Sequence, residues 1–341
     1  MTRLPLLPRL ARLPRLARLP RLARPATALA AGAALGMLAA GPASAADPTV
    51  TDPHVVAHFD FGAGETPENI ALEPDGSADI TLAYAHEVVR VDHHGDREPV
   101  AELPPVANPQ TPNIGAAIAT GIARAHDGTL YVAYATGTEE TGIWRIATDG
   151  ALEQIAHLPA DGLPNGIALD ERCGVLYVAD SARGVVWRVP VNGDEPTVWA
   201  SGPALEPSAD LPFGANGLKI HDGAVWVSNT AASALLRIPV GPGPDHAAGP
   251  IETRATGLVG IDDFAFTGHS DTVLAALVLD SELELVRPDG SHKTVLTAAD
   301  GLSNPTSVAV HAKKVYVTSA GYFVPNPDPN LLLARISKNK L

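Results

Sequence analysis

The chain has 341 residues and carries 38 acidic against 24 basic side chains, which gives a formal net charge of −14. This excess of negative charge argues against nucleic acids and anionic membranes as partners, because both bind through positive patches. Cys173 is the single cysteine, so an intramolecular disulfide is excluded and stability must come from a large core. The length is ample for such a core.

Residues 1–45 are predicted to be a secretory signal peptide. Residues 1–24 hold seven arginines and no acid, residues 26–40 are apolar and uncharged, and Ala43-Ser44-Ala45 forms a small-residue cleavage pattern. The apolar stretch is shorter than the roughly 20 residues that span a bilayer, and a permanent N-terminal anchor is the alternative. Cleavage leaves 17 basic against 38 acidic residues, near −21. We therefore expect a secreted, extracellular monomer that has no membrane contact after cleavage.

Short apolar or alternating runs separated by Gly, Pro, Asp and Asn fill residues 46–341, and this pattern is typical of β-strands. One strand type recurs at 128–135, 174–181, 223–230 and 313–320. Each copy starts six to eight residues after the start of another apolar strand, at 121–125, 166–170, 217–221 and 307–311. Third and fourth strands follow in several units, for example at 142–147 and 153–159.

Aligning the first strands gives six equivalent positions spaced 44 to 52 residues apart: Glu68, Thr120, Asn165, Asn216, Asp262 and Thr306. Four strands per unit at a period of 40 to 50 residues is the mark of a β-propeller. The sequence therefore predicts an all-β fold, a six-bladed β-propeller over residues 46–341. Two stacked β-sandwiches are the alternative all-β fold, but they predict no such repeat.

Ring closure can be predicted as well. After Thr306 only three strands remain, the last at about 331–337, whereas residues 54–62 resemble the outermost strand of the other units. We expect the N-terminal strand to complete the last blade and remove the open edge of a broken ring.

The six aligned positions are predicted to surround the propeller axis at its rim. Four of them carry carboxylate or carboxamide oxygens: Glu68, Asn165, Asn216 and Asp262. Oxygen donors without Cys or His suit a hard divalent cation, and Ca²⁺ fits best, although another divalent ion is possible. Taken singly, each Asn or Asp has a simpler role as a turn cap.

The whole of residues 46–341 resembles the SMP-30/gluconolactonase/luciferin-regenerating-enzyme family and, more distantly, diisopropyl-fluorophosphatase. The motifs that carry the resemblance are ETPENIAL, LPNGIAL, GANGLKI and GIDDFAF, which start at residues 65, 163, 214 and 260. The resemblance implies a rim metal site of Glu68, Asn165, Asn216 and Asp262, with metal-assisted hydrolysis of a lactone or ester. It implies Asp262 as the base, with Asp263 a weaker candidate, and contacts to a small-molecule substrate from Thr120, Asn304 and Thr306.

Departures from the family pattern bear on the substrate. The sugar-lactonase branch often has an arginine two residues before its blade-three asparagine and an acid just after it, where this chain has Leu163 and Gly166. Asp263 replaces the usual glycine after the blade-five aspartate, and no histidine stands at 303–306. These departures favour a less polar lactone or ester. A non-catalytic secreted binding propeller and a phosphotriesterase are the competing function classes.

Overall fold

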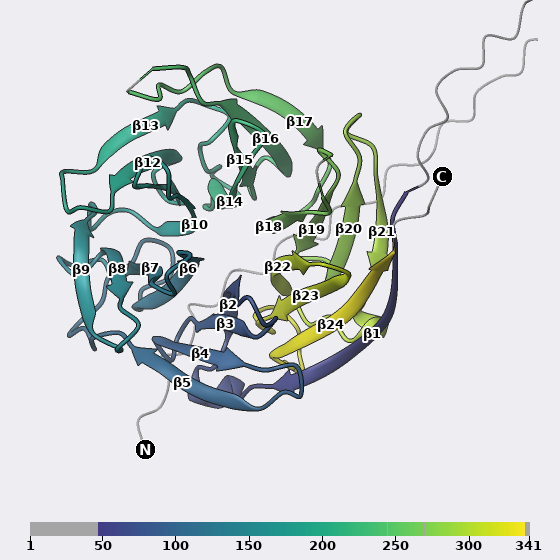
Figure 1. Ribbon diagram of the computed structural model, residues 1–341. Helices are drawn as coiled ribbons and strands as arrows, with labels where there is room; N and C mark the ends of the chain where they lie inside the picture. Colours follow the sequence, from purple (N-terminus) through teal and green to yellow (C-terminus); the bar gives the residue numbers. More distant parts are fainter. Residues whose placement is uncertain (1–46, 244, 269, 338–341) are drawn as a thin grey trace, which may run out of the picture.

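The computed structural model describes residues 47–243, 245–268 and 270–337, so the predicted signal peptide at residues 1–45 lies outside it. In the described residues, 24 strands form six four-stranded antiparallel sheets arranged around one axis (Figure 1). The predicted six-bladed β-propeller is confirmed, and the stacked-sandwich alternative is wrong.

Blades one to five each use four consecutive strands, which run from the axis outward. Blade one comprises β2 (Pro67–Leu72), β3 (Ala78–Leu82), β4 (Glu87–Val91) and β5 (Arg97–Glu102). Blade two comprises β6 (Ile118–Arg124), β7 (Leu130–Ala135), β8 (Gly142–Ile146) and β9 (Leu152–His157). Blade three comprises β10 (Pro164–Asp170), β11 (Val175–Asp180), β12 (Val185–Pro190) and β13 (Thr197–Ser201). Blade four comprises β14 (Ala215–His221), β15 (Ala224–Asn229), β16 (Ala234–Pro239) and β17 (Glu252–Thr256). Blade five comprises β18 (Ile261–Phe266), β19 (Val273–Leu277), β20 (Glu282–Val286) and β21 (His292–Leu296).

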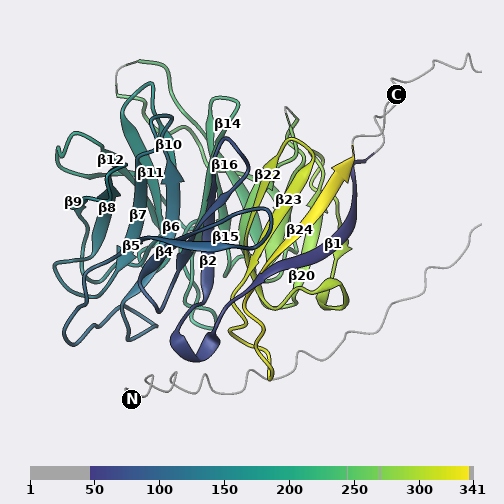
Figure 2. The same cartoon turned by 60° about the horizontal axis from the view of Figure 1, so that its bottom comes forward.

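Blade six joins the two ends of the described chain. It is built from β22 (Pro305–His311), β23 (Lys314–Ser319), β24 (Asn330–Ser337) and the N-terminal β1 (Thr49–His58), in the order β1-β24-β23-β22. β1 runs antiparallel along the outside of β24 (Figure 2). The predicted closure is confirmed, although β1 starts five residues earlier than expected and ends at His58. The chain then turns through a 3-10 segment, Phe61–Ala63, because Asp60 accepts hydrogen bonds from the amides of Gly62 and Ala63.

The core lies between the blades. The fourth residue of most inner strands is a large apolar side chain that belongs to a different buried cluster in each blade: Ile70, Ile122, Ile167, Leu218, Phe264 and Val308. Burying one such side chain stabilises the fold by about 1.5–3 kcal/mol. Alternation along the strand then turns the residues on either side of it toward the next blade.

In the part of the chain that the structure covers, helix is limited to two 3-10 turns, Phe61–Ala63 and Ala298–Asp300. None of this helix is long and apolar enough to cross a membrane.

Candidate functional site

The six aligned residues sit near the start of the six inner strands, which surround the axis (Figure 1). They lie inside these strands rather than just before them, as the second residue of each except Thr120, which is the third. In every blade the pairing of the inner strand is irregular at this point, for example between Pro164 and Ile167. The extra residue of such a bulge re-aims side chains, so one backbone feature repeats at all six positions.

The six aligned residues are called the ring below. Two of them are buried carboxylates, Glu68 at 9% and Asp262 at 8% exposure. Burial raises the pKa of Glu68 to about 7, with a further rise from the charge of Asp263 and an opposing hydrogen bond from Tyr322. Burial also raises the pKa of Asp262 well above its usual range, and the charges of Glu68 and Asp263 add to the rise. The Asn216 amide and the Lys219 ammonium lower the pKa of Asp262 only in part. Like charges are therefore held together out of water, an arrangement that a bound cation relieves.

The two ring amides are oriented by hydroxyl groups. The side-chain nitrogen of Asn165 donates to Ser181 at 3.3 Å, and that of Asn216 donates to Thr230 at 2.9 Å. Both hydroxyls in turn donate to the inner strand of the next blade, to the carbonyls of Ala215 and Ile261. Since each amide nitrogen is held in this way, its oxygen is left for another partner. Within the described residues no hydrogen bond reaches either amide oxygen.

This donor set fits a hard divalent cation. It offers two carboxylates and two amide oxygens, which calcium accepts, whereas zinc prefers Cys and His. Among the residues in view no group of three or more His, Cys, Asp or Glu converges on one point. The four proposed donors do not form such a group, because two of them are the amides of Asn165 and Asn216. Metal binding by Glu68, Asn165, Asn216 and Asp262 stays a prediction.

The three predicted substrate contacts have their polar atoms engaged between blades. The hydroxyl of Thr120 donates to the Pro164 carbonyl at 2.8 Å, and that of Thr306 donates to the Pro67 carbonyl at 2.9 Å. The amide nitrogen of Asn304 donates to the Val278 carbonyl, and its oxygen accepts from the backbone of Phe323. These bonds tie neighbouring blades together and favour a structural role. Contact with a substrate stays a prediction for all three.

Tyr322 is a site residue that the sequence did not reveal. Its hydroxyl donates to Oε2 of Glu68 at 2.6 Å. Its ring meets those of Tyr84 and Phe323 edge to face, with centroids 6.2 and 5.9 Å away. Glu68 and Tyr322 are 254 positions apart, so no local pattern signals the pair.

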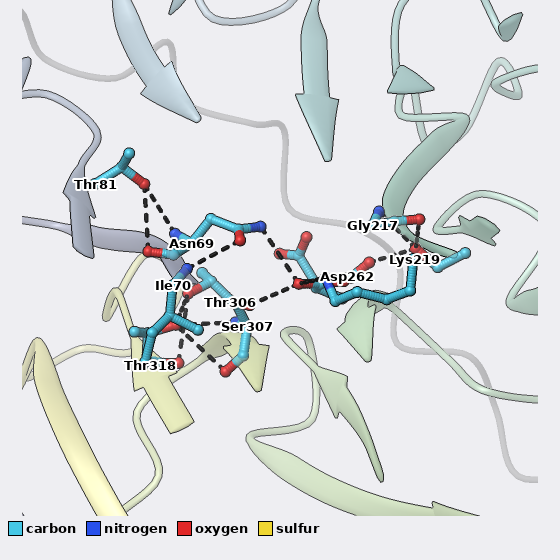
Figure 3. A network of polar contacts seen from close by, with 11 residues as sticks. Asn69, Ile70, Thr81, Gly217, Lys219, Asp262, Thr306, Ser307 and Thr318 are labelled. Carbon is cyan, nitrogen blue, oxygen red and sulfur yellow. Dashed lines mark hydrogen bonds and ion pairs between the residues drawn. The ribbon is translucent and has the colours of Figure 1, made fainter. Parts of the chain in front are cut away.

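A second polar group lies beside the ring, centred on Asp263. Asp263 accepts from Lys219 at 2.7 and 2.6 Å, from Ser307 at 2.6 Å and from Asn69 at 3.3 Å. Figure 3 shows Asn69 and Ser307 reaching toward Lys219 from the opposite side. These four side chains come from blades one, four, five and six, so they join more than half of the propeller near its axis.

The position after the ring explains one departure from the family pattern. In blades two, three and four this position is a glycine: Gly121, Gly166 or Gly217. A Cβ on Gly166 would lie 2.4 Å from the Asn216 carbonyl oxygen, and one on Gly121 would lie 2.1 Å from that of Asn165. Inner strands approach too closely there for any side chain, so an acid at residue 166 is excluded by space.

Two surface cavities lie away from the ring. One, of about 340 Å³, is lined by Glu73, Arg90 and Arg124 of blades one and two. The other, of about 680 Å³, lies beside His58 and Asp328. Neither cavity is lined by a ring residue, so the ring is separate from both cavities.

The fold and the ring define a six-bladed propeller with an oxygen-rich axial site. No protein-family model matches the chain, and the curated proteins include no match. Among solved structures, the regucalcin from Agrobacterium tumefaciens, described as a calcium-binding protein, is 16% identical, with a TM-score of 0.61 over 85% of this chain and 96% of its own. A gluconolactonase from Xanthomonas campestris is 14% identical, with a TM-score of 0.60 over 86% and 98%. Virginiamycin B lyase from Staphylococcus aureus is 12% identical, with a TM-score of 0.54 over 85% and 99%. The neighbours thus include gluconolactonase- and regucalcin-like propellers, and at these identities the likeness establishes the fold.

Proposed function

We propose that this protein is a secreted, calcium-dependent hydrolase that opens a lactone or cleaves an ester. The observation that carries the proposal is the set of four oxygen donors at one repeated position of four blades. Two are buried carboxylates with raised pKa values, and two are amides whose nitrogens donate hydrogen bonds to neighbouring hydroxyls. Structural likeness to a gluconolactonase and to a calcium-binding regucalcin supports the same activity and ion.

Each ring residue has a defined part in this proposal. Glu68, Asn165, Asn216 and Asp262 would hold the ion, which when bound supplies a Lewis acid for the substrate carbonyl. Asp262 also takes a proton from the attacking water, because it is a buried carboxylate at the proposed ion site. Tyr322 keeps Glu68 in place through its hydrogen bond.

Secretion is part of the proposal because residues 1–45 combine a basic region, an apolar stretch and an Ala-Ser-Ala cleavage pattern. Expression of the full chain with its natural N-terminus tests this point. We expect a secreted protein whose N-terminal residue is Ala46. A product that stays attached to the membrane and keeps residues 1–45 would instead support the permanent anchor.

The hydrolase is tested by measuring turnover of a panel of lactones and esters by the mature protein, with chelator and after adding calcium. We expect chelation to abolish turnover, calcium to restore it, and Asp262→Asn to lower kcat by about 10²–10⁴-fold. Asp161→Asn is the matched control, because Asp161 is exposed and forms an ion pair with Arg183 rather than with a ring residue. Absence of turnover under every condition would favour a binding propeller, and turnover of organophosphates alone would favour a phosphotriesterase.

A further inference from the structure

The inner strands share one more repeated position, three residues after the ring. Five blades have alanine there and one has lysine: Ala71, Ala123, Ala168, Ala265, Ala309 and Lys219. The alanines pack with the apolar clusters between blades, where a small side chain suits the close approach of neighbouring inner strands. A lysine at this position is an exception to the repeat and calls for a specific role.

Lys219 forms an ion pair with one residue, Asp263. Its ammonium lies 2.7 and 2.6 Å from the two carboxylate oxygens of Asp263 and 5.8 Å from the ring centre of Phe264. The side chain of Asp263 is only 1% exposed, and that of Lys219 is 27% exposed. Asp263 directly follows the ring residue Asp262, so the ammonium is placed next to the proposed ion site.

The charges near the axis can be counted. When ionised, as in the cation-bound site, Glu68, Asp262 and Asp263 contribute three negative charges, and Lys219 contributes one positive charge. The sum is −2, which one divalent ion neutralises. Because these groups are largely buried, solvent screens their interactions much less than it screens surface charges.

We propose that Lys219 is a built-in counter-charge that matches the axial site to a single divalent ion, and so determines which ionic charge the site selects. This inference rests on the metal site of the proposed function. Removing the ammonium would leave a site of charge −3, which favours a trivalent ion. Removing the Asp263 charge would leave −1, which disfavours trivalent ions most of all.

The test compares Ca²⁺ and Tb³⁺ binding by isothermal titration at fixed pH and salt, in the mature wild-type protein and in two variants. For Lys219→Met we expect Ca²⁺ affinity to rise about tenfold and Tb³⁺ affinity about 30-fold, because the interaction energy scales with the charge of the ion. For Asp263→Asn we expect both affinities to fall, that for Tb³⁺ more steeply. The opposite signs keep the test decisive even where one variant folds poorly.

Two further variants separate charge from structure. Lys219→Arg keeps the charge and should keep the wild-type ratio of Tb³⁺ to Ca²⁺ affinity, whereas the double variant Lys219→Met/Asp263→Asn restores a charge of −2 and should return to that ratio. If the wild-type protein binds Ca²⁺ but the ratio stays constant across all variants, the counter-charge role is wrong and the metal site stands. If the wild-type protein binds neither ion, the metal site of the proposed function is itself contradicted.

Discussion

The hydroxyl of Tyr322 lies 2.6 Å from Oε2 of Glu68, and this hydrogen bond joins the loop after β23 in blade six to the first strand of blade one. This bond occupies Oε2 of Glu68, and within the described residues no hydrogen bond reaches Oε1. The bond also lowers the pKa of Glu68 against the effect of burial. Tyr322 thus connects the proposed ion site to the loop 320–329.

Tyr322→Phe removes this bond and nothing else of the ring. Because a hydrogen bond to a charged group is worth about 1.5–3 kcal/mol, we expect calcium affinity to fall at least about tenfold. Calcium titration measures the change. Tyr84→Phe is the control, since Tyr84 packs against Tyr322 without a hydrogen bond to Glu68 among the described residues. Equal calcium affinity in wild type and Tyr322→Phe would contradict a positioning role.

The raised carboxylate pKa values predict how stability depends on pH. The pKa of Glu68 rises from 4.5 to about 7 on folding, so between these values the folded state binds more protons than the unfolded state. The metal-free protein therefore loses stability as pH rises through this window, on the order of 3 kcal/mol. The raised pKa of Asp262 acts in the same direction.

Calcium should reverse this trend, because it binds the deprotonated carboxylates. Calorimetric Tm values with and without calcium, taken from pH 5 to 8, should show a calcium-induced gain that grows with pH. Asp79, whose pKa is raised to about 6 by burial, lies away from the ring and affects both series alike. A calcium gain in Tm that is the same at pH 5 and pH 8 would rule out the linkage.

Close strand approach at the axis predicts a steric effect. Gly166→Ala places a Cβ 2.4 Å from the Asn216 carbonyl oxygen and 2.7 Å from the Leu218 nitrogen, both of them backbone atoms. We expect a loss of about 1–3 kcal/mol in the free energy of unfolding, measured by urea denaturation. Gly62→Ala is the matched control, because its Cβ would meet only a side-chain oxygen of Asp60, at 3.1 Å. A Gly166→Ala protein as stable as the control would show that the strands can separate freely.

Closure of the ring by the N-terminal strand can be tested by deletion. A mature chain that starts at residue 59 lacks β1 and leaves β24 as an open edge. We expect it to be more than about 3 kcal/mol less stable and to aggregate on size-exclusion chromatography. Asp47→Asn removes only the ion pairs of Asp47 with Arg287 and Lys293, and should lower stability by about 1 kcal/mol or less. A truncated chain that elutes as a stable monomer would contradict closure by β1.

The repeat made most of the fold predictable. Each blade carries its own strands and turns in sequence order, so the six ring positions and even the union of β1 with β24 could be found by aligning the chain with itself. The ends of β1 could not be predicted, because its register with β24 depends on pairing with residues about 280 positions away. The hydrogen bonds of Thr120 and Thr306 to the next blade likewise depend on how blades pack.

The site was only partly predictable for the same reason. Glu68, Asn165, Asn216 and Asp262 share a register position and are buried, and their binding of one ion stays a prediction. Tyr322 occupies a loop outside the repeat, so its contact with Glu68 leaves no trace in the spacing. Lys219 is visible in the repeat, as the single lysine at a position where the other five blades have alanine. Its role could not be predicted, because it depends on the contact with Asp263 in the next blade.

The central claim is that four side chains from four blades hold one cation on the axis. Isothermal titration of calcium into the mature wild-type protein, into Glu68→Ala and into Asp262→Ala, with Asp161→Asn as control, tests it most directly. We predict one calcium per chain and a raised Tm in the wild type and the control, with neither in the two ring variants. Calcium binding in Glu68→Ala and Asp262→Ala as tight as in the wild type would contradict the account.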